Sequence, residues 1–387
     1  MKNNSTLFGQ LLQIISRYDF EKLVKSYEAE KYNKGFKNWE QFTAMSYGQL
    51  SGMDNLRSIE RGLSIQSNKL YHLGIKPIKR STLSYANSKR SYEVYENLFY
   101  EVLKKTAAAN PKHKFRFKNP LYSMDTTTIE LCLGLHNWAK FRKTKGGIKL
   151  HLKLNHCGYT PDFAVVTEGN VHETNAARNI RYNRGDVVVF DRGFNDYKMF
   201  ASYCRQRIYF VTRMKSNAKY KVIERIKSRH KNILSEQIIR FTGFYSKRNC
   251  PIKLRKIKVK DNKTGKTITL LTNQFEWSAK TIGEIYKDRW QIEIFFKNIK
   301  QKLKIKSFLG TSKNAILTQI WIALIIYLLL SYLIFLSKYK WTIYSIVSAL
   351  SGCLFLKKDI WLWLNSPFDD CKIKNNYLNS DQLELKF

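Results

Sequence analysis

The sequence predicts an α/β fold in which a mixed β-sheet is preceded by an all-α N-terminal region and followed by C-terminal helices. Three observations predict it. Short apolar runs punctuated by Gly and Asn alternate with helical segments between residues 118 and 215, which is typical of a sheet covered by helices. Residues 1–90 carry apolar side chains at helical spacing, and residues 314–337 form one long uncharged apolar stretch.

The charge of the chain indicates its class of partner. The 387 residues include 68 Lys plus Arg against 30 Asp plus Glu, a net charge of +38, and the basic residues recur along the whole chain. Such a surface is suited to neutralising many phosphates, so we expect a nucleic acid partner. A solvated basic surface without a partner is the alternative. The hydrophobic content of 44% argues against wholesale disorder.

Cysteine usage and the N-terminus indicate an intracellular protein. The six cysteines are scattered without a C-x-x-C pair, in a chain long enough to fold without disulfides. The first ten residues, MKNNSTLFGQ, lack the apolar run of a secretory signal. We therefore expect a cytoplasmic protein with reduced thiols.

Residues 1–90 are predicted to form a compact module of short helices with a basic face. The apolar positions at helical spacing include Leu7, Leu11, Leu12 and Ile15. Basic residues interleave with them, most densely between residues 76 and 90. A DNA-binding domain that recognises DNA ends is the preferred interpretation, and a helical docking domain is the alternative.

Residues 91–117 are predicted as a helical linker, and residues 118–310 as the α/β core. Its apolar runs begin at LYSM, IKLHL, FAVV, DVVVF and IYFV and give the order strand, strand, strand, helix, strand, helix, strand. That is the order of a ribonuclease-H-like mixed sheet. Residues 216–275 are Lys-rich and strand-like, with a hairpin turn at 262–265, and are predicted to be a β-rich insertion.

The last segment, residues 311–387, is predicted to form C-terminal helices and a tail. Its uncharged stretch at 314–337 is long enough to cross a bilayer. That stretch also holds Thr318, Gln319 and Ser331 and lies in a chain otherwise rich in Lys. We therefore expect a fully buried helix rather than a membrane span.

Two aspartates end apolar strands, where they are poorly placed for a core. Asp125 follows LYSM and Asp191 follows VVVF, and the glycine in DRGF lets the chain bend sharply after the second strand. An aspartate in such a place either caps the next turn or takes part in chemistry. Carboxylates from different elements that converge on divalent ions are what two-metal phosphoryl transfer requires. Both are candidate catalytic and metal-binding residues.

A third carboxylate shares a helical stripe with cations. Tyr286, Arg289, Glu293 and Lys300 are offset by 0, 3, 7 and 14 residues, an arc of about 60° on one continuous helix starting near residue 280. A solvated salt-bridge face would also put Arg289 four residues from Glu293. The neighbours, however, are apolar: Trp290, Ile292, Ile294, Phe295 and Phe296. We therefore prefer a mostly buried helix whose stripe faces a cleft, with Glu293 binding metal and the cations gripping phosphate.

These segments resemble a known family. DTTTI at 125–129, DRGF at 191–194 and Y-x2-R-x3-E-x6-K at 286–300 are similar to the three catalytic blocks of insertion-sequence DDE transposases, specifically the subgroup with the Y-R-E-K signature (insertion-sequence family four). N-terminal segments such as SYGQLSGMDNLRSIERGL resemble the leading domain of many such transposases. The resemblance covers nearly the entire chain.

The resemblance implies a ribonuclease-H-like DDE catalytic core in which Asp125, Asp191 and Glu293 bind two Mg²⁺ ions, for which Mn²⁺ can substitute. The implied activity is cut-and-paste transposition: the protein binds terminal inverted repeats in double-stranded DNA, cleaves the ends through a hairpin, and joins the 3′ ends to target DNA. The implied DNA contacts are Tyr286, Arg289, Lys300, Arg213 and Lys215. Relatives act as dimers, so we expect a homodimer on DNA, nucleoid-associated in a bacterial cytoplasm, and no membrane.

The resemblance leaves one role unassigned and two alternatives open. A hairpin requires a flipped base stacked on an aromatic side chain, and residues 216–275 contain no Trp; Phe244, Tyr245 or Trp277 could take that place. One alternative function is a catalytically decayed or repurposed DNA-binding protein. The other is a metal-dependent nuclease that does not join strands.

Overall fold

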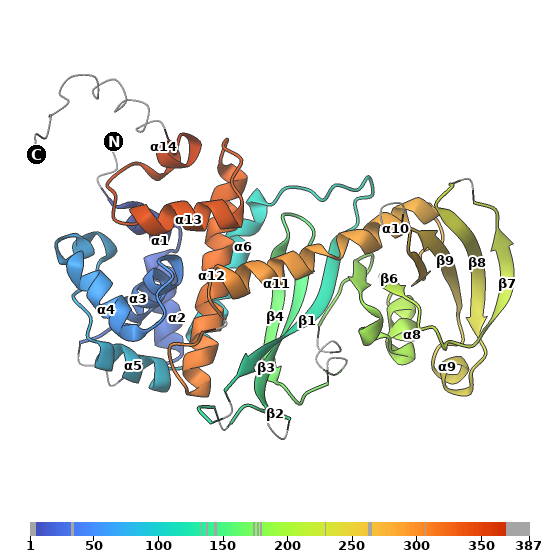
Figure 1. The fold of residues 1–387 in the computed structure, drawn as a ribbon, viewed down its shortest axis with the longest axis horizontal. Helices are drawn as coiled ribbons and strands as arrows, with labels where there is room; N and C mark the ends of the chain where they lie inside the picture. Colours follow the sequence, from blue (N-terminus) through green and yellow to red (C-terminus); the bar gives the residue numbers. More distant parts are fainter. Residues whose placement is uncertain are drawn as a thin grey trace, which may run out of the picture. The chain divides into compact units, whose positions relative to one another are not determined.

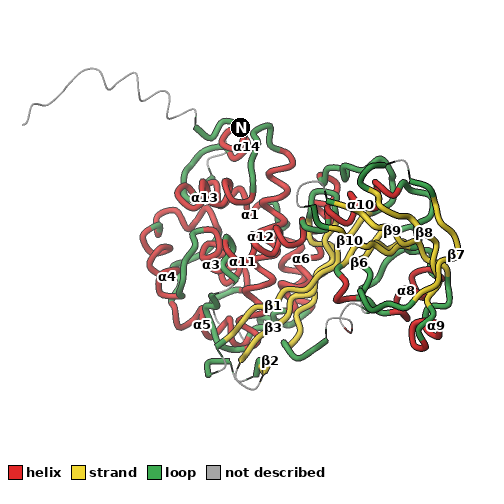
Figure 2. Tube along the Cα trace, turned by 45° about the vertical axis from the view of Figure 1, so that its right-hand side comes forward, coloured by secondary structure: helices red, strands yellow, loops and turns green. Residues whose placement is uncertain are grey.

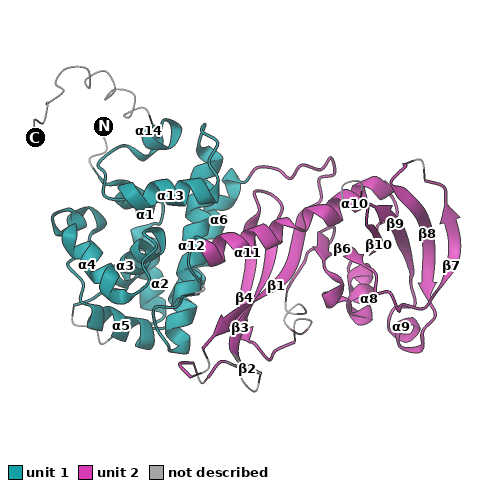
Figure 3. Cartoon of the chain, in the orientation of Figure 1, with its two compact units in different colours: residues 1–110, 302–387 teal, residues 111–301 magenta. Residues whose placement is uncertain are grey.

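The computed structural model describes residues 5–368 apart from a few internal positions, namely 32–34, 133, 137, 143–144, 173–174, 176–177, 179, 229, 262–264 and 306. The chain forms two compact units, coloured separately in Figure 3. Unit 1 comprises Met1–Asn110 with Lys302–Phe387, and unit 2 comprises Pro111–Gln301. The predicted division at residues 90, 117 and 310 stays a prediction, and it did not anticipate that the two ends of the chain build one unit.

Unit 1 is helical (Figure 1; Figure 2). Its N-terminal helices are α1 (Leu7–Gln13), α2 (Arg17–Ser26), α3 (Asn38–Leu50), α4 (Leu56–Ile65), α5 (Arg80–Lys89) and α6 (Glu93–Thr106), with 3₁₀ segments η1 (Ser67–Leu73) and η2 (Ala107–Ala109). Its C-terminal helices are α12 (Lys313–Leu336), α13 (Ile343–Cys353) and α14 (Ile360–Asn365). Several helices begin at a Ser, Thr or Asn side chain that accepts a backbone N–H of the first turn, as Ser16 and Asn55 do.

Backbone contacts join the two ends of the chain within unit 1. Leu7 N–H donates to the carbonyl of Leu356, and Phe8 N–H donates to that of Leu354, both at 2.9 Å. The Gln10 amide donates to the Lys358 carbonyl at 2.7 Å. The first helix of the chain is therefore fixed to its last helices.

Helix α12 is the core of unit 1. By length and composition it could cross a membrane, but 78% of its most apolar stretch is buried inside the protein. It packs against α3, α5, α6 and α13. Its buried Gln319 has protein partners, since it donates to the Ser307 carbonyl and accepts from Leu309 N–H, each at 3.0 Å. The buried Thr318 hydroxyl has no hydrogen-bond partner among the described residues. The structure thus confirms the prediction of a buried helix.

Unit 2 is built on one mixed sheet of ten strands. These are β1 (Leu121–Leu131), β2 (Lys140–Arg142), β3 (Lys145–Asn155), β4 (Thr160–Glu168), β5 (Val187–Phe190), β6 (Tyr209–Arg213), β7 (Tyr220–Ile226), β8 (Ile233–Phe241), β9 (Lys253–Lys260) and β10 (Thr267–Thr272). Their order is β2-β3-β1-β5-β6-β10-β9-β8-β7, with β4 also paired to β3. The pairs β1–β5 and β5–β6 are parallel and the others are antiparallel.

The segment predicted as a β-rich insertion extends this same sheet. β10 pairs with β6, and β9, β8 and β7 follow outward, with the short helix α9 (Phe244–Asn249) after β8. The hairpin of β9 and β10 was expected, but residues 262–264 of its turn lie outside the described residues. Most of the helix predicted over 172–180 and the end of the C-terminal tail also lie outside them.

Helices cover the strands that carry the parallel pairs. η3 (Arg192–Phe194) and α8 (Tyr197–Arg205) connect β5 to β6, while α10 (Ala279–Asp288) and α11 (Gln291–Gln301) follow β10. Figure 1 shows α10 and α11 running across strands of the sheet, and α11 packs on β1 while α10 packs on β5 and β6.

The single long helix predicted from residue 280 is wrong, because the structure has two helices separated by a turn at Arg289–Trp290. In the turn, Trp290 N–H donates to Lys287 and Glu293 N–H to Trp290, so i→i−3 bonds replace the α-helical pattern and tighten the winding. The neighbours are also less buried than predicted. Trp290 and Ile294 are 60% and 40% exposed, while the other three apolar residues of the segment are buried.

Candidate active site

Two adjacent parallel strands bring Asp125 and Asp191 together. In the pairing of β1 with β5, Met124 lies opposite Phe190. Asp125 is the residue after Met124, and Asp191 is the residue after Phe190. Asp125 is still within β1, whereas Asp191 follows β5 and caps η3. The prediction that Asp125 ends an apolar strand is wrong, because β1 continues to Leu131. The parallel pairing still places Asp125 beside Asp191, at the point where β5 ends.

Helices α10 and α11 add a phenol, a guanidinium and a third carboxylate. The Tyr286 hydroxyl donates to Asp191 Oδ1 at 3.2 Å. Arg289 Nη1 lies 3.3 Å from Asp125 Oδ2 and 3.5 Å from Glu293 Oε1, so two carboxylates share one guanidinium nitrogen. The stripe residues therefore contact Asp125 and Asp191 even though the helix that carries them is broken.

Lys300, near the end of α11, contacts strand β1. Its ammonium donates to the Thr127 hydroxyl and, at 2.9 Å, to the Thr128 carbonyl. Because Thr127 is two residues from Asp125 along β1, it points to the same face of the sheet. Lys300 therefore lies on the side of the sheet that carries the carboxylates, and its predicted grip on phosphate stays a prediction.

Arg213 and Lys215 lie at the end of β6, the other neighbour of β5 in the sheet. Arg213 ends β6, and its positive charge is one of the influences on the Tyr286 hydroxyl. Lys215 Nζ donates to the Asn195 carbonyl at 3.3 Å, and the Asn195 amide donates to the Arg213 carbonyl at 2.9 Å. The sequence analysis missed Asn195, which links the two basic residues to the chain after Asp191; its place directly after DRGF is the signal that could have found it.

The site is shielded from solvent to different degrees. The side chains of Arg289 and Asp125 are 12% and 16% exposed, and that of Glu293 is 40% exposed. Burial and the negative charge of Asp191 raise the pKa of Tyr286, so its hydroxyl remains a hydrogen-bond donor at neutral pH.

The chemistry of the donors suits a hard divalent cation. The three carboxylates offer only oxygen ligands, which Mg²⁺ prefers. Within the described residues no three His, Cys, Asp or Glu side chains stand together as a formed metal site. The nitrogen of Arg289 instead lies between Asp125 and Glu293, so positive charge already occupies the space between two of the carboxylates. The residues fit a cation at this position.

The three aromatic candidates for base stacking differ in availability. Trp277 is stacked on Phe117 with 4.0 Å between ring centroids, so its face is already covered by protein. Phe244 and Tyr245, on α9, are 88% and 58% exposed and line a cavity of about 590 Å³ together with Lys215. The structure thus separates Trp277 from the other two.

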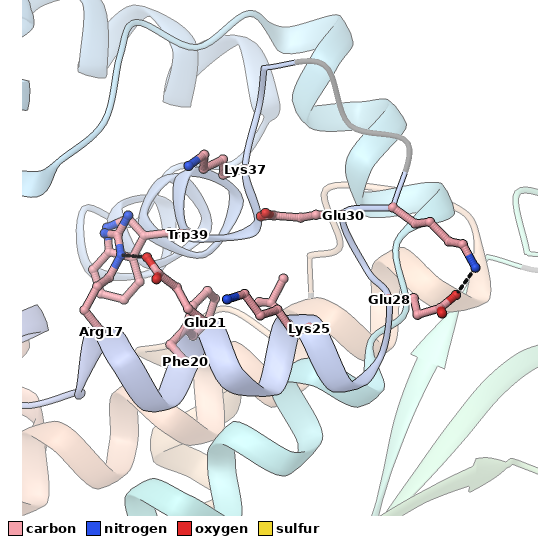
Figure 4. A pocket seen from close by; sticks show the side chains of 10 residues that line it. Arg17, Phe20, Glu21, Lys25, Glu28, Glu30, Lys37 and Trp39 are labelled. Atoms are coloured by element: carbon pink, nitrogen blue, oxygen red, sulfur yellow. Dashed lines mark hydrogen bonds and ion pairs between the residues drawn. The ribbon is translucent and has the colours of Figure 1, made fainter.

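Unit 1 has a pocket of its own, shown in Figure 4, with a volume of about 380 Å³. Arg17 lies over the ring of Trp39, 4.2 Å from its centroid, and pairs with Glu21 at 3.3 Å. Its charged lining mixes both signs: Arg17, Lys25, Lys31 and Lys37 against Glu21, Glu28 and Glu30. Opposite charges therefore offset one another in this pocket.

Comparison with known families decides the identity of the chain. Residues 116–329, more than half of the chain, match the model described as "Transposase DDE domain", and residues 3–76 match a domain of unknown function, DUF4372. The chain belongs to the DDE transposase family. The candidate site of this transposase lies within the matched residues.

Relatives are named as insertion-sequence transposases. A protein of Sinorhizobium fredii named as transposase y4zB is 35% identical over 242 residues, 61% of this chain and 67% of its own length. The transposase named for element IS5377 in Geobacillus stearothermophilus is 26% identical and covers 86% of both chains. One named for element IS4SA in Synechocystis is 27% identical over 66% of this chain and 71% of its own. The narrower Y-R-E-K subgroup stays a prediction.

Proposed function

We propose that this transposase moves its element by cut-and-paste transposition, in which it binds the terminal inverted repeats, cleaves the DNA ends through a hairpin and joins the 3′ ends to target DNA. The observation that carries the proposal is the meeting of Asp125, Asp191 and Glu293 with Arg289 and Tyr286. Carboxylates beside a guanidinium suit a phosphate group that must be held by cations while a P–O bond is broken.

The proposed core is ribonuclease-H-like. Support comes from the strand order β4-β3-β1-β5-β6, in which three antiparallel strands precede two parallel ones. β10 and the three strands beyond it would then be an insertion that extends the sheet before the helix of Glu293.

Asp125, Asp191 and Glu293 are the residues that would hold two Mg²⁺ ions, or Mn²⁺ in their place. Bound there, the ions would supply Lewis-acid chemistry for the attacking and leaving oxygens. Arg289 would turn its guanidinium from the carboxylates toward a phosphate when DNA and cations enter. Asp191 would keep the Tyr286 hydroxyl oriented, because the raised pKa of that phenol leaves its proton in place.

The remaining basic residues would track the DNA backbone. Arg213 lies close enough to Tyr286 for its charge to affect the pKa of that residue, and Lys215 contacts Asn195. Lys300 of α11 contacts β1 at Thr128. Charged donors at several points along a cleft fix the register of a duplex without reading its sequence. Phe244 or Tyr245 is the proposed partner of a flipped base, since both rings are exposed beside Lys215.

Unit 1 is the proposed reader of the inverted repeats. Between Glu60 and Glu93 the chain has seven Lys or Arg residues and no acidic residue. Helix α5 lies in this segment; Leu83 and Ala86 are buried, while Arg80, Tyr85 and Lys89 are exposed. An exposed basic helix on a packed scaffold is suited to a DNA groove. We propose a homodimer on DNA, in the cytoplasm and associated with the nucleoid.

Mg²⁺-dependent cleavage and joining of a DNA that carries the element's own ends tests the function. We expect the natural chain to yield joined product, and Glu293→Gln to lose at least about a thousand-fold in rate while DNA affinity is kept. Lys297→Gln, an exposed change on the same helix, is the control.

Each other outcome has a definite meaning. Equal activity of Glu293→Gln and the natural chain would show that the active site is misplaced. Cleavage without any joined product would identify a nuclease. Binding without cleavage by the natural chain would identify a decayed or repurposed DNA-binding protein.

A further inference from the structure

A buried carboxylate lies next to the candidate site without contacting its three carboxylates. Asp288 ends α10, directly before Arg289, and its side chain is 2% exposed. It accepts from His156 Nδ1 at 2.7 Å, from the Tyr159 hydroxyl at 3.2 Å and from the Lys114 ammonium. Burial acts to raise the pKa of Asp288, but the hydrogen bonds from His156 and Lys114 outweigh it, so the pKa is lowered and the group is charged.

His156 connects this carboxylate to strand β1. Its Nε2 lies 2.7 Å from Ser123 Oγ, and both side chains are buried. Burial lowers the pKa of His156 despite its carboxylate neighbour, so the ring is neutral. It donates a hydrogen bond to Asp288 and accepts one from the Ser123 hydroxyl. Serine, histidine and aspartate in this order form hydrolytic triads. Here the exposure of Ser123 is 0%, so no substrate reaches its hydroxyl. The chain of hydrogen bonds Ser123–His156–Asp288, called the relay below, must therefore have another role.

The relay is the first of three contacts between one face of β1 and the α10–α11 segment. Ser123, Asp125 and Thr127 alternate along the strand and therefore share a face. Their partners, in the same order, are Asp288 through His156, then Arg289, then Lys300. The relay and Lys300 thus bracket the pair of Asp125 and Arg289.

We propose that Asp288 is a positioning residue that, with His156 and Lys114, fixes the turn between α10 and α11 on β1 so that Arg289 faces Asp125 and Glu293. This inference rests on the function proposed above. The turn needs such an anchor because it is held by i→i−3 bonds and because Trp290 within it is 60% exposed and packs little. Lys114 also ties the loop that begins unit 2 to the same carboxylate.

The test combines a double-mutant cycle with hydrogen exchange on the full chain. At saturating end DNA and Mg²⁺ we expect Asp288→Asn to slow cleavage about 10–100-fold without changing DNA affinity, because a misplaced supporting group costs that much at comparable sites. In an Arg289→Met background the same change should cost less than about 3-fold, since Asp288 acts through Arg289. Amides of residues 289–293 should exchange faster in Asp288→Asn.

A second pair of variants keeps the test valid if Asp288→Asn folds poorly. Lys114→Met should show the same pattern at smaller amplitude, while Lys112→Met, which changes another exposed lysine of the same loop, should show none. An equal loss in both Arg289 backgrounds, or unchanged exchange at the turn, would overturn the positioning role. If the natural chain itself cleaves nothing, the proposed function fails, and the exchange data still decide whether Asp288 fixes the turn.

Discussion

Arg255, in strand β9, and Arg289, at the end of helix α10, pair with carboxylates in different ways. Arg255, in the outer half, is 4% exposed and donates to Glu236 and to the carbonyls of Gln274 and Trp277, so each of its nitrogens has a partner. Arg289, in the half with the aspartates, shares one nitrogen between two carboxylates at 3.3 and 3.5 Å.

The difference indicates which ion pair can be exchanged for a ligand. A saturated, buried pair is held by the fold and costs much to break. Arg289 Nη1 lies 3.3 and 3.5 Å from its two carboxylate partners, whereas Arg255 Nε lies 2.8 Å from Glu236, so we expect Arg289 to leave its partners for a phosphate at a smaller cost. The Nε of Arg289 also has no hydrogen-bond partner within the described residues. We therefore expect Arg255 to be structural and Arg289 to be available for binding.

The largest expected effect is the opposite response of these arginines to the same substitution. Arg255→Met should lower the free energy of unfolding by about 3–5 kcal/mol, because Glu236, 7% exposed, would be left buried without its partner. Arg289→Met should change it by about 1 kcal/mol or less, yet slow DNA cleavage by about a hundred-fold or more. Urea denaturation and single-turnover cleavage measure the two quantities.

The comparison breaks if the two variants behave alike. A large loss of stability in Arg289→Met would make that residue structural, and a fully stable Arg255→Met would remove the contrast. Arg240→Met, on β8, is a matched control for loss of a partly buried arginine in the outer half.

The sequence predicted the residues of the candidate site better than it predicted the contacts that hold them in place. Asp125 and Asp191 could be singled out because each directly follows an apolar run, although β1 continues through Asp125 to Leu131. The turn at Arg289–Trp290 was not predictable, because helical periodicity continues through it and only packing on β1 decides the break. The buried partnership of His156 with Asp288, 132 residues apart, leaves no local pattern to find.

The arrangement of the outer elements was likewise beyond local patterns. Residues 216–275 read correctly as strands, but their pairing to β6 rather than to a separate sheet depends on the contact of β10 with β6. The union of the first and last helices in unit 1 depends on backbone bonds between α1 and the chain near Leu356. Such long-range contacts arise from closure of the fold and not from propensity.

The next effect sharpens the comparison through pH, because the half with the aspartates also buries a neutral histidine. His151 is 2% exposed between the hydroxyls of Thr126 and Thr167, and burial followed by the charge of Lys149 lowers its pKa to about 4. Below its ordinary pKa of 6.5 the unfolded chain binds a proton that the folded chain does not. Stability should therefore be complete above pH 6.5 and fall by up to about 3 kcal/mol toward pH 4.

His151→Gln isolates this contribution. Its unfolding free energy should vary less steeply with pH in that window, by up to about 1.4 kcal/mol per pH unit, which corresponds to one proton. His230→Gln, at an exposed position, should leave the slope unchanged. A slope that persists unchanged in His151→Gln would show that folding does not lower the pKa of His151.

The smallest effect concerns two cations of helix α5. Unlike Arg255 and Arg289, they have no carboxylate within ion-pair distance in the part of the chain that the structure describes. Arg80 and Lys89 bound helix α5 and are exposed. If they contact phosphates of the inverted repeat, Arg80→Gln and Lys89→Gln should each lower the slope of log affinity against log salt by about 1, whatever the sequence of the duplex. Lys104→Gln, an equal charge loss on α6, should leave it nearly unchanged. An equal change in all three variants would mean that net charge rather than α5 governs binding, and no change in any would return unit 1 to the helical docking domain.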